Sequence, residues 1–454
     1  MNKYLEKITP RVREIYHIDD NTPYSLERID ASSLVTPCRL DVLMKEYYVY
    51  SKLNGMNMEF ATEMFKKQVH SITCFSDKEN GQDYKNNQNS FVSEFDKIID
   101  SIKTNGFDDE ISLIPISADN VVLDGAHRLA CALYLNIKVN VIRFPHISVE
   151  SVVRPCCYDY NFFKEYLLDL KYIDLSVKEY IKKSQKNIYV ACLWPVADDA
   201  KKREEAVRLI KEKYNVIYTK DCKMSFKAFC KFIAQVYMHD SWVGSIENDF
   251  SGSASKALLT YKRKGNLTFV FFEGNSKEET LLFKDEVRKI FNIDKHSVHI
   301  TDNTQETKLI AEIVLNKNSL DFLEKSNTKL NVNLIRKLYN DVQEKIFGVE
   351  LSKGVYGLKK IDAGECDLSL RRLRQGFSID DLLACPDNFY TYLNRKFIVP
   401  KKSVLDNFFS EYDSRNLLEE NNVWMHAVRD TLNYYCNYLK MIAKMKVKQM
   451  LKRL

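Results

Sequence analysis

Five residues with chemically capable side chains, Asp-Gly-Ala-His-Arg at 124–128, separate an apolar segment at 121–123 from another at 129–135. The first apolar segment is expected to form a strand and the second a helix. A strand, a tight turn and a helix in this order present backbone N–H groups to a phosphate. A carboxylate, an imidazole and a guanidinium in the turn are suited to hold and move a phosphoryl group. The simpler alternative is an ordinary Asp-Gly turn whose His-Arg pair neutralises nearby carboxylates.

The phosphate interpretation gives each residue of the turn a role. Gly125 and Ala126 would offer backbone amides to phosphate oxygens at the start of the helix. Arg128 can clamp those oxygens through two N–H groups. His127 can donate to the phosphate or assist a proton transfer, and Asp124 could hold Mg²⁺ or orient His127. The turn therefore predicts a site for a phosphoryl group, with Asp124 as a candidate ligand of Mg²⁺.

The segment 90–145 resembles the ParB/sulfiredoxin superfamily, whose fingerprint is a strand, Asp-Gly-x-His-Arg and a helix of small residues. Sulfiredoxins carry a reactive cysteine directly before the His-Arg pair, where this chain has Ala126, so sulfur chemistry of that type is not expected. Chromosome-partitioning ParB proteins extend the motif with an arginine run and a helix-turn-helix domain. Here 129–130 is Leu-Ala, and no such domain is visible downstream.

The chain looks more like the small-molecule kinases built on this fold, which phosphorylate free serine with a nucleotide. This resemblance implies ATP or CTP, together with Mg²⁺, as the cofactor. Those kinases carry Asp-Gly-His-His-Arg, so the alanine at 126 departs from their pattern as well. They also use an N-terminal carboxylate, for which the resemblance nominates Glu27 and Asp41. The catalytic residues that the resemblance implies are thus Asp124, His127, Asp41 and Glu27. Further segments at 218–220 (Tyr-Thr-Lys), 237 (Tyr), 242–244 (Trp-Val-Gly) and 295–302 (Lys-His-Ser-Val-His-Ile-Thr-Asp) extend the pattern. Together they make most of 25–325 resemble a ParB-like protein of bacterial surface-polysaccharide gene clusters, which implies work in surface glycan biosynthesis.

The second half carries a weaker resemblance to nucleotidyltransferases. A Gly-Ser pair precedes the carboxylates of 247–249, and a Val-Tyr-Gly-Leu segment precedes those of 362–367. That activity needs paired carboxylates that hold Mg²⁺, and Asp249 is the candidate ligand there. An exposed acidic turn is the alternative for 362–367. Lys256 follows a run of small residues that could cradle a phosphate, although the spacing is not that of a P-loop.

The length and amino-acid composition of the chain limit the class of protein to which it can belong. The 454 residues are enough for about three domains, and a hydrophobic content of 45% is ample for globular cores. The net charge of +6 is a mild excess that does not by itself indicate a nucleic-acid partner. Eleven scattered cysteines without a Cys-x-x-Cys pair indicate a reduced, cytoplasmic protein. The vicinal pair Cys156-Cys157 remains open between redox activity and packing.

The expected fold class is multidomain α/β, because strands alternate with helices from residue 187 onward. An N-terminal ParB/sulfiredoxin-like α+β domain would precede a second α/β domain and a C-terminal mixed and helical region. The expected divisions are a lead-in at 1–24, the ParB/sulfiredoxin-like domain at 25–150, a helical connector at 151–186, an α/β domain at 187–327, a small mixed α/β segment at 328–420 and a basic amphipathic helix at 421–454.

The C-terminal segment 437–454 has lysines four residues apart on one face and apolar residues on another. This pattern is typical of a helix that lies on an anionic membrane surface. An oligomer-forming or solvated terminal helix is the alternative. No apolar run reaches the ~18 residues of a membrane span, so the chain is expected in the cytoplasm, with peripheral contact at the inner face of the membrane as an option.

Three functions remain after these observations. The first is a nucleotide-dependent phosphotransferase that acts on a small polar or sugar-like acceptor. The second is a nucleotidyltransferase that uses the ParB-like unit as a binding module. The third is a ParB-type nucleic-acid-binding protein or nuclease, which the sparse clustering of basic residues outside the tail disfavours.

Overall fold

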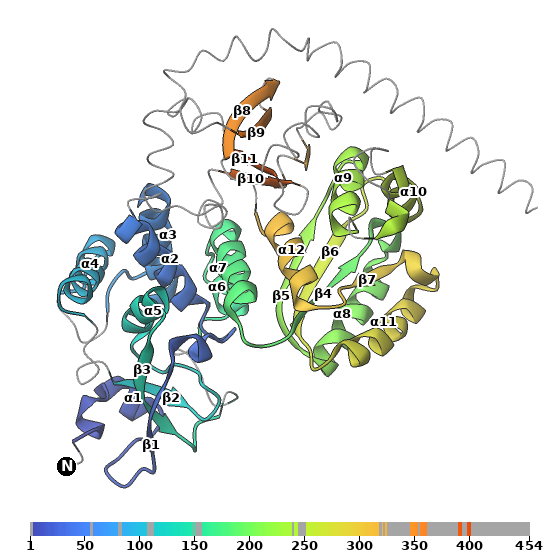
Figure 1. The fold of residues 1–454 in the computed structure, drawn as a ribbon. Coiled ribbons are helices and arrows are strands. Elements are labelled where there is room, and N and C mark those ends of the chain that lie inside the picture. Colours follow the sequence, from blue (N-terminus) through green and yellow to red (C-terminus); the bar gives the residue numbers. More distant parts are fainter. Residues whose placement is uncertain are drawn as a thin grey trace, which may run out of the picture. The chain divides into compact units, whose positions relative to one another are not determined.

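The computed structural model has a mixed α/β fold, which confirms the expected fold class at this level (Figure 1). Twelve α-helices and eleven strands lie in the described residues. The structure describes residues 3–54, 58–79, 84–106, 113–148, 150, 157–237, 240–243, 251–316, 320 and 323–324, and the backbone of four strands at 346–352, 355–360, 389–392 and 397–400.

The chain divides into two compact units. The first comprises Met1–Tyr189 with Tyr214–Tyr218 and Phe271–Ser276. The second comprises Val190–Lys213, Thr219–Val270 and Lys277–Leu454.

The first unit is built on a three-stranded sheet in the order β1-β3-β2. Strand β3 (Lys138–Phe144) pairs antiparallel with β1 (Ser25–Asp30) and parallel with β2 (Ile114–Ser117). Helix α5 (Ala126–Leu135) connects the two parallel strands, which is the usual crossover for a parallel pair. The turn at 124–128 therefore lies where the chain leaves the sheet and enters α5.

The segment expected as a strand at 121–123 forms only a single bridge, between Val122 and Ile116. It returns antiparallel beside β2, since the backbone N–H of Leu123 donates to the carbonyl of Pro115 at 2.9 Å. All three residues of the segment are buried. The apolar character thus marks burial correctly, whereas the ladder that would make a strand is too short.

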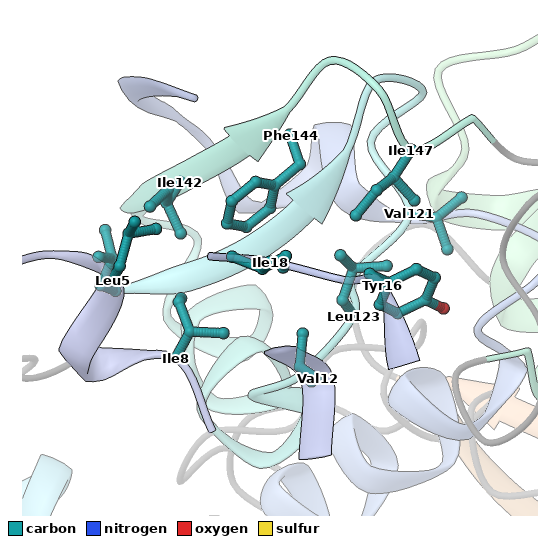
Figure 2. Close-up of a cluster of buried hydrophobic side chains, with 11 residues drawn as sticks. Leu5, Ile8, Val12, Tyr16, Ile18, Val121, Leu123, Ile142, Phe144 and Ile147 are labelled. Atoms are coloured by element: carbon teal, nitrogen blue, oxygen red, sulfur yellow. The ribbon is translucent and has the colours of Figure 1, made fainter. Parts of the chain in front are cut away.

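One face of the sheet is covered by the N-terminal segment, which includes η1 (Leu5–Lys7) and α1 (Pro10–Ile15). Figure 2 shows this cluster, with Leu5, Ile8 and Val12 facing the strand that carries Ile142 and Phe144. The alternation of strand side chains explains the arrangement, because residues two apart point to the same face. The residues before β1 therefore belong to the core of the first unit.

The other face of the sheet packs against helices. Val139 and Val141 of β3 share a buried cluster with Leu129 and Ala132 of α5, and with Val42 of α2 (Leu40–Asn54). The small side chains on α5 let that helix approach the strands closely. The remaining helical elements of this unit are η2 (Ala31–Leu34), α3 (Met58–Ile72), α4 (Gln88–Asn105), α6 (Tyr160–Glu165) and α7 (Leu170–Lys183).

A second sheet has the strand order β5-β6-β4-β7. Strand β7 pairs antiparallel with β4, so this edge of the sheet is antiparallel. The strands are β4 (Ile188–Leu193), β5 (Asn215–Cys222), β6 (Leu267–Glu273) and β7 (Val298–Ile300). The helical elements around them are η4 (Pro195–Ala197), α8 (Ala200–Lys213), α9 (Phe226–Val236), η5 (Ser241–Val243), α10 (Ser251–Thr260), α11 (Lys277–Phe291), η7 (Asp294–His296) and α12 (Thr304–Val314).

Two antiparallel hairpins occur in the segment expected at 328–420. Strand β8 (Ile346–Ser352) pairs with β9 (Val355–Lys360), and β10 (Phe389–Tyr392) pairs with β11 (Phe397–Pro400). The carboxylates of 362–367, and the basic helix expected at 421–454 with its membrane-contact segment 437–454, lie outside the described residues. In the part of the chain that the structure describes, no helix combines the length and the apolar character that crossing a bilayer requires.

The substitution Leu5→Ala is expected to lower the free energy of unfolding by about 2–5 kcal/mol, because it opens a cavity in the cluster against β3. The matched control is Leu26→Ala, since Leu5 is 0% exposed and Leu26 is 44% exposed. Chemical denaturation of both variants measures the difference. Equal losses in the two variants would contradict a structural role for the N-terminal segment.

Candidate phosphate-binding site

Helix α5 begins without a side-chain cap. Its N-cap residue is Gly125, which lies in the left-handed region with φ 86° and makes no side-chain cap hydrogen bond. Four other helices have their first turn capped by a side chain, from Asn87, Asp159, Ser225 and Asn303. The uncapped amides and the positive end of the dipole at α5 are an arrangement that favours an anion.

A glycine is required at position 125 by the positive φ of the backbone and also by the space that the side chain of Arg128 occupies. A Cβ placed on it would lie 3.1 Å from Nη2 of Arg128, so the guanidinium folds back over the turn. The backbone N–H of Gly125 donates to Oδ1 of Asp124 at 2.7 Å, which fixes that carboxylate beside the start of the helix. Burial lowers the pKa of Arg128, while the charge of Asp124 opposes this effect.

The substitution Gly125→Ala is expected to lower the free energy of unfolding by about 1–2 kcal/mol through its positive φ. If this turn binds phosphate, the substitution should also weaken that binding, because the new methyl group displaces the guanidinium of Arg128. Gly106→Ala is the matched control, since Gly106 has φ 79° and a methyl group added there would meet no atom within 4 Å. Denaturation and calorimetric titration with ATP measure the two effects. Equal losses of affinity in both variants would contradict the link between Gly125 and Arg128.

A buried ion cluster made of Arg39, Asp41 and Lys45 lies at the start of α2. Asp41 accepts hydrogen bonds from Arg39 at 2.8 and 2.9 Å, and from Nζ of Lys45 at 2.8 Å. Arg39 also donates to the backbone carbonyl of Val122, which ties the cluster to the segment before the turn. Gln68 of α3 donates to the backbone carbonyl of Asp41 at 2.9 Å. The cluster therefore joins α2, α3 and the segment leading to α5.

The charges in this cluster decide its protonation. Burial alone would raise the pKa of Asp41, but the charges of Arg39 and Lys45 hold that pKa well below its ordinary value. Burial lowers the pKa of Lys45, while Asp41 opposes this effect. Two cations around one carboxylate leave the cluster with a net positive charge.

The charges of this cluster act on the imidazole of His127. Its ring packs edge-on against Phe95, with centroids 4.5 Å apart, and lies 5.9 Å from the ring of Phe65. Burial lowers the pKa of His127 well below its ordinary value, and the positive charges of Lys45 and Lys85 lower it further. The imidazole is therefore neutral at pH 7, in a setting of two aromatic rings and nearby cations.

Lys85 is the third cation near this ring, from the segment just before α4. Its Nζ pairs with Oε2 of Glu79 at 2.6 Å and lies 5.6 Å from the ring centroid of Phe91. Its charge also lowers the pKa of Lys45. Cations from three separate elements, at 45, 85 and 128, thus act on the imidazole of His127.

The two carboxylates nominated for catalysis lie in different environments. Asp41 belongs to the ion cluster, and its charge acts on His127. Glu27 of β1 instead pairs with Arg143 of β3 at 2.7 and 3.0 Å. Its pKa is lowered mainly by the hydrogen bond from Arg143. Of the two, Asp41 is the one whose charge raises the pKa of His127.

The remaining nominated residues fall in the second unit. Lys256 lies on α10, where its Nζ donates to the carbonyl of Lys295 at 3.2 Å and lies 6.0 Å from the ring centroid of Tyr237. Asp249, with the rest of the carboxylate group at 247–249, lies outside the described residues. By contrast, Lys45, Lys85 and Arg128, whose charges lower the pKa of His127, all belong to the first unit.

Sequence reasoning missed Arg39, Lys45 and Lys85. For Lys45 a signal was present, because Asp41 and Lys45 are four residues apart and so share one face of a helix. That spacing is common on solvent-exposed helices, and nothing in it indicates burial. Lys85 lacks even this signal, since it approaches His127 only through the tertiary fold.

Within residues 124–128, Asp124 is the single carboxylate that could bind a metal ion. Among the described residues, no group of three or more His, Cys, Asp or Glu side chains is arranged to hold a metal ion. Mg²⁺ commonly takes one or two carboxylates and fills its remaining positions with water and substrate phosphates. Asp124 fits an ion that arrives with a nucleotide, rather than one resident in a protein cage.

Comparison of the chain with protein-family models, with curated proteins and with solved structures finds no match.

Proposed function

We propose that the protein is a nucleotide-dependent phosphotransferase that binds nucleotide phosphates at the turn formed by residues 124–128. The observation that carries the proposal is the convergence of three cations on a neutral His127 at the uncapped start of α5. Phosphate oxygens would accept from the first-turn amides and from Arg128. Lys45 and Lys85 would balance the remaining negative charge.

Phosphoryl transfer depends mainly on positioning and charge neutralisation, so this set of groups is sufficient. In the proposed reaction the acceptor hydroxyl gives its proton to His127, and its oxygen bonds to the terminal phosphorus. The bond between that phosphorus and the bridging oxygen breaks, and the nucleoside diphosphate leaves. A bound phosphate raises the pKa of the neighbouring imidazole, because a negative charge favours the protonated form. The bound nucleotide itself would thus make His127 a better base.

Asp41 takes a positioning role in this proposal. A carboxylate whose pKa is held low accepts a proton poorly, so it is ill suited to act as the base. Its hydrogen bonds instead hold Lys45 in place. Asp124 would contribute one ligand to Mg²⁺, which supplies further neutralisation of phosphate charge when it is bound.

The arrangement of the first unit also supports the proposal that residues 25–150 form a ParB/sulfiredoxin-like domain. The parallel pair β2 and β3, with α5 as their crossover, carries Asp-Gly-Ala-His-Arg at the start of the helix. Membership of the branch that phosphorylates small molecules would make a hydroxyl compound of low molecular weight, free serine or a sugar, the acceptor class.

The products of the reaction test the proposal. The full chain would be incubated with ATP or CTP, Mg²⁺ and a panel of hydroxyl amino acids and monosaccharides, and the products would be separated by chromatography. We expect one nucleoside diphosphate for each phosphorylated acceptor. Release of pyrophosphate would contradict the proposal and indicate nucleotidyl transfer. Binding of nucleic acid that weakens steeply with salt, without nucleotide turnover, would contradict it in favour of a ParB-type protein.

A further inference from the structure

Two partly buried thiols lie side by side in the first unit, on segments far apart in the chain. Arg39 and Tyr158 form a parallel β-bridge, and the backbone N–H of Tyr158 donates to the carbonyl of Cys38 at 2.8 Å. Cys38 and Cys157 each precede a bridged residue, so they are the neighbouring pair in the same register. Their side chains consequently point to the same side of the bridge.

The spacing of such a pair suits a disulfide. Neighbouring strands lie about 4.8 Å apart, and disulfides join residues with Cα atoms about 4.4–6.8 Å apart. Both side chains pack against the same buried cluster, the one formed with Leu5 and Phe144. A bond between the two sulfur atoms therefore requires rotation of the side chains without a rearrangement of the backbone.

The environment gives the two thiols different reactivities. A hydrogen bond joins the side chains, and it lowers the pKa of Cys157 while it raises the pKa of Cys38. The thiolate is the reactive form of cysteine, so Cys157 is the better nucleophile. By contrast, burial raises the pKa of Cys131 on α5 to about 12. Both Cys38 and Cys157 are free thiols in the structure.

We propose that Cys38 and Cys157 form a site of reversible oxidation, at which a hydroperoxide converts the two thiols to an intramolecular disulfide. The Cys157 thiol first loses its proton, and the thiolate attacks the hydroxyl oxygen of the peroxide. The O–O bond breaks, a sulfenic acid forms, and the departing oxygen takes up the released proton to leave as water or an alcohol. The thiol of Cys38 then attacks this sulfur, loses its proton and expels the hydroxyl group as water. Two thiols are oxidised by two electrons in total, and one peroxide is reduced.

The site is independent of the proposed phosphotransfer, so a failure of nucleotide binding leaves it standing. It is nevertheless next to the ion cluster, because Arg39 directly follows Cys38 and its guanidinium lies 5.4 Å from the ring centroid of Tyr158. The disulfide would close a chain loop between residues 38 and 157. Such a closure restricts the unfolded chain, so the thermal midpoint should rise by about 4 °C or more.

Peptide mapping tests the proposal on the full chain. The reduced protein would be treated with one equivalent of hydrogen peroxide, its remaining thiols blocked with N-ethylmaleimide, and its unreduced digest analysed by mass spectrometry. We expect a linked peptide that contains Cys38 and Cys157, two fewer blocked thiols, and reversal by dithiothreitol. A bond between Cys156 and Cys157, or oxidation that forms no link between Cys38 and Cys157, would overturn the proposal.

Variants make the test specific. Cys38→Ser is expected to abolish the disulfide and the rise in thermal midpoint, and to leave a sulfenic acid at Cys157. Cys74→Ser is the control, because Cys74 is an exposed free thiol elsewhere in the same unit, and it should change neither result. A rise in thermal midpoint that persists in Cys38→Ser would contradict the assignment. Mapping of the wild-type chain decides the question even where that variant folds poorly.

Discussion

The substitution Asp41→Asn is expected to lower the free energy of unfolding by about 3–5 kcal/mol at pH 7. It leaves two buried cations, Arg39 and Lys45, without the carboxylate that neutralises them, and unpaired buried charges are costly. Asp41 is 1% exposed, so water cannot replace the lost partner. Urea denaturation of the variant and the wild type at pH 7 measures the loss.

The pH dependence of this loss in the free energy of unfolding identifies its cause. The pKa of Asp41 in the folded protein is depressed, so its stabilising contribution is present above the ordinary aspartate pKa of about 3.9. That contribution is lost as the pH falls through the lower pKa of the folded state. The difference in the free energy of unfolding between the wild type and Asp41→Asn should therefore be largest near pH 7. It should become smaller below about pH 4.

Glu27→Gln is the matched control for this prediction. Glu27 also pairs with an arginine, but its side chain is 33% exposed in that pair. Partly exposed ion pairs contribute about 0–1 kcal/mol, so the control should lose little stability and no nucleotide affinity. A loss below about 1 kcal/mol in Asp41→Asn at pH 7 would contradict the buried ion cluster.

If the proposed function holds, the substitution Lys45→Met is expected to weaken nucleotide binding by about 10- to 100-fold, because it would remove the proposed charge-assisted contact with phosphate. It should also raise the pKa of His127, since the charge of Lys45 contributes to the lowering of that pKa. Asp41 keeps its partner Arg39, so the cluster becomes neutral and the fold is retained. Calorimetry and an NMR titration of the histidine ring protons measure the two effects.

Lys52→Met is the control on the same helix. Lys52 pairs with Asp96 at 2.9 Å and with Asp100 at 3.4 Å, and the largest shifts of the pKa of His127 come from other residues. Its loss should leave both the titration and the affinity unchanged. An unchanged His127 titration in Lys45→Met would show that Lys45 does not act on the ring, and would contradict the proposed charge arrangement.

The local fold around the turn could largely be predicted from the sequence. The apolar segments on either side of 124–128 indicated burial, and the expected helix is present as α5. The helix begins at Ala126 rather than at Leu129, because its first turn carries the polar residues His127 and Arg128. Apolar periodicity detects the buried turns of a helix and misses a first turn that carries polar side chains.

The composition of the site could be predicted only in part. The motif residues lie together because they are adjacent in the chain, whereas Lys45 and Lys85 reach His127 through the packing of α2 and of the segment before α4. Charged side chains at such positions usually face solvent, so their types alone give no reason to place them in a buried site. The resemblance that nominated Asp41 also nominated Glu27, and only the tertiary structure separates the two.

Calorimetric titration with ATP and CTP in the presence of Mg²⁺ tests the central claim most directly, on the wild type and on the double variant His127→Ala/Arg128→Ala. The expected result is binding by the wild type and loss of that binding in the double variant, with an unchanged circular dichroism spectrum. Binding that persists in the double variant would place the nucleotide away from residues 124–128 and would contradict the account. The absence of binding by the folded wild type would contradict it equally.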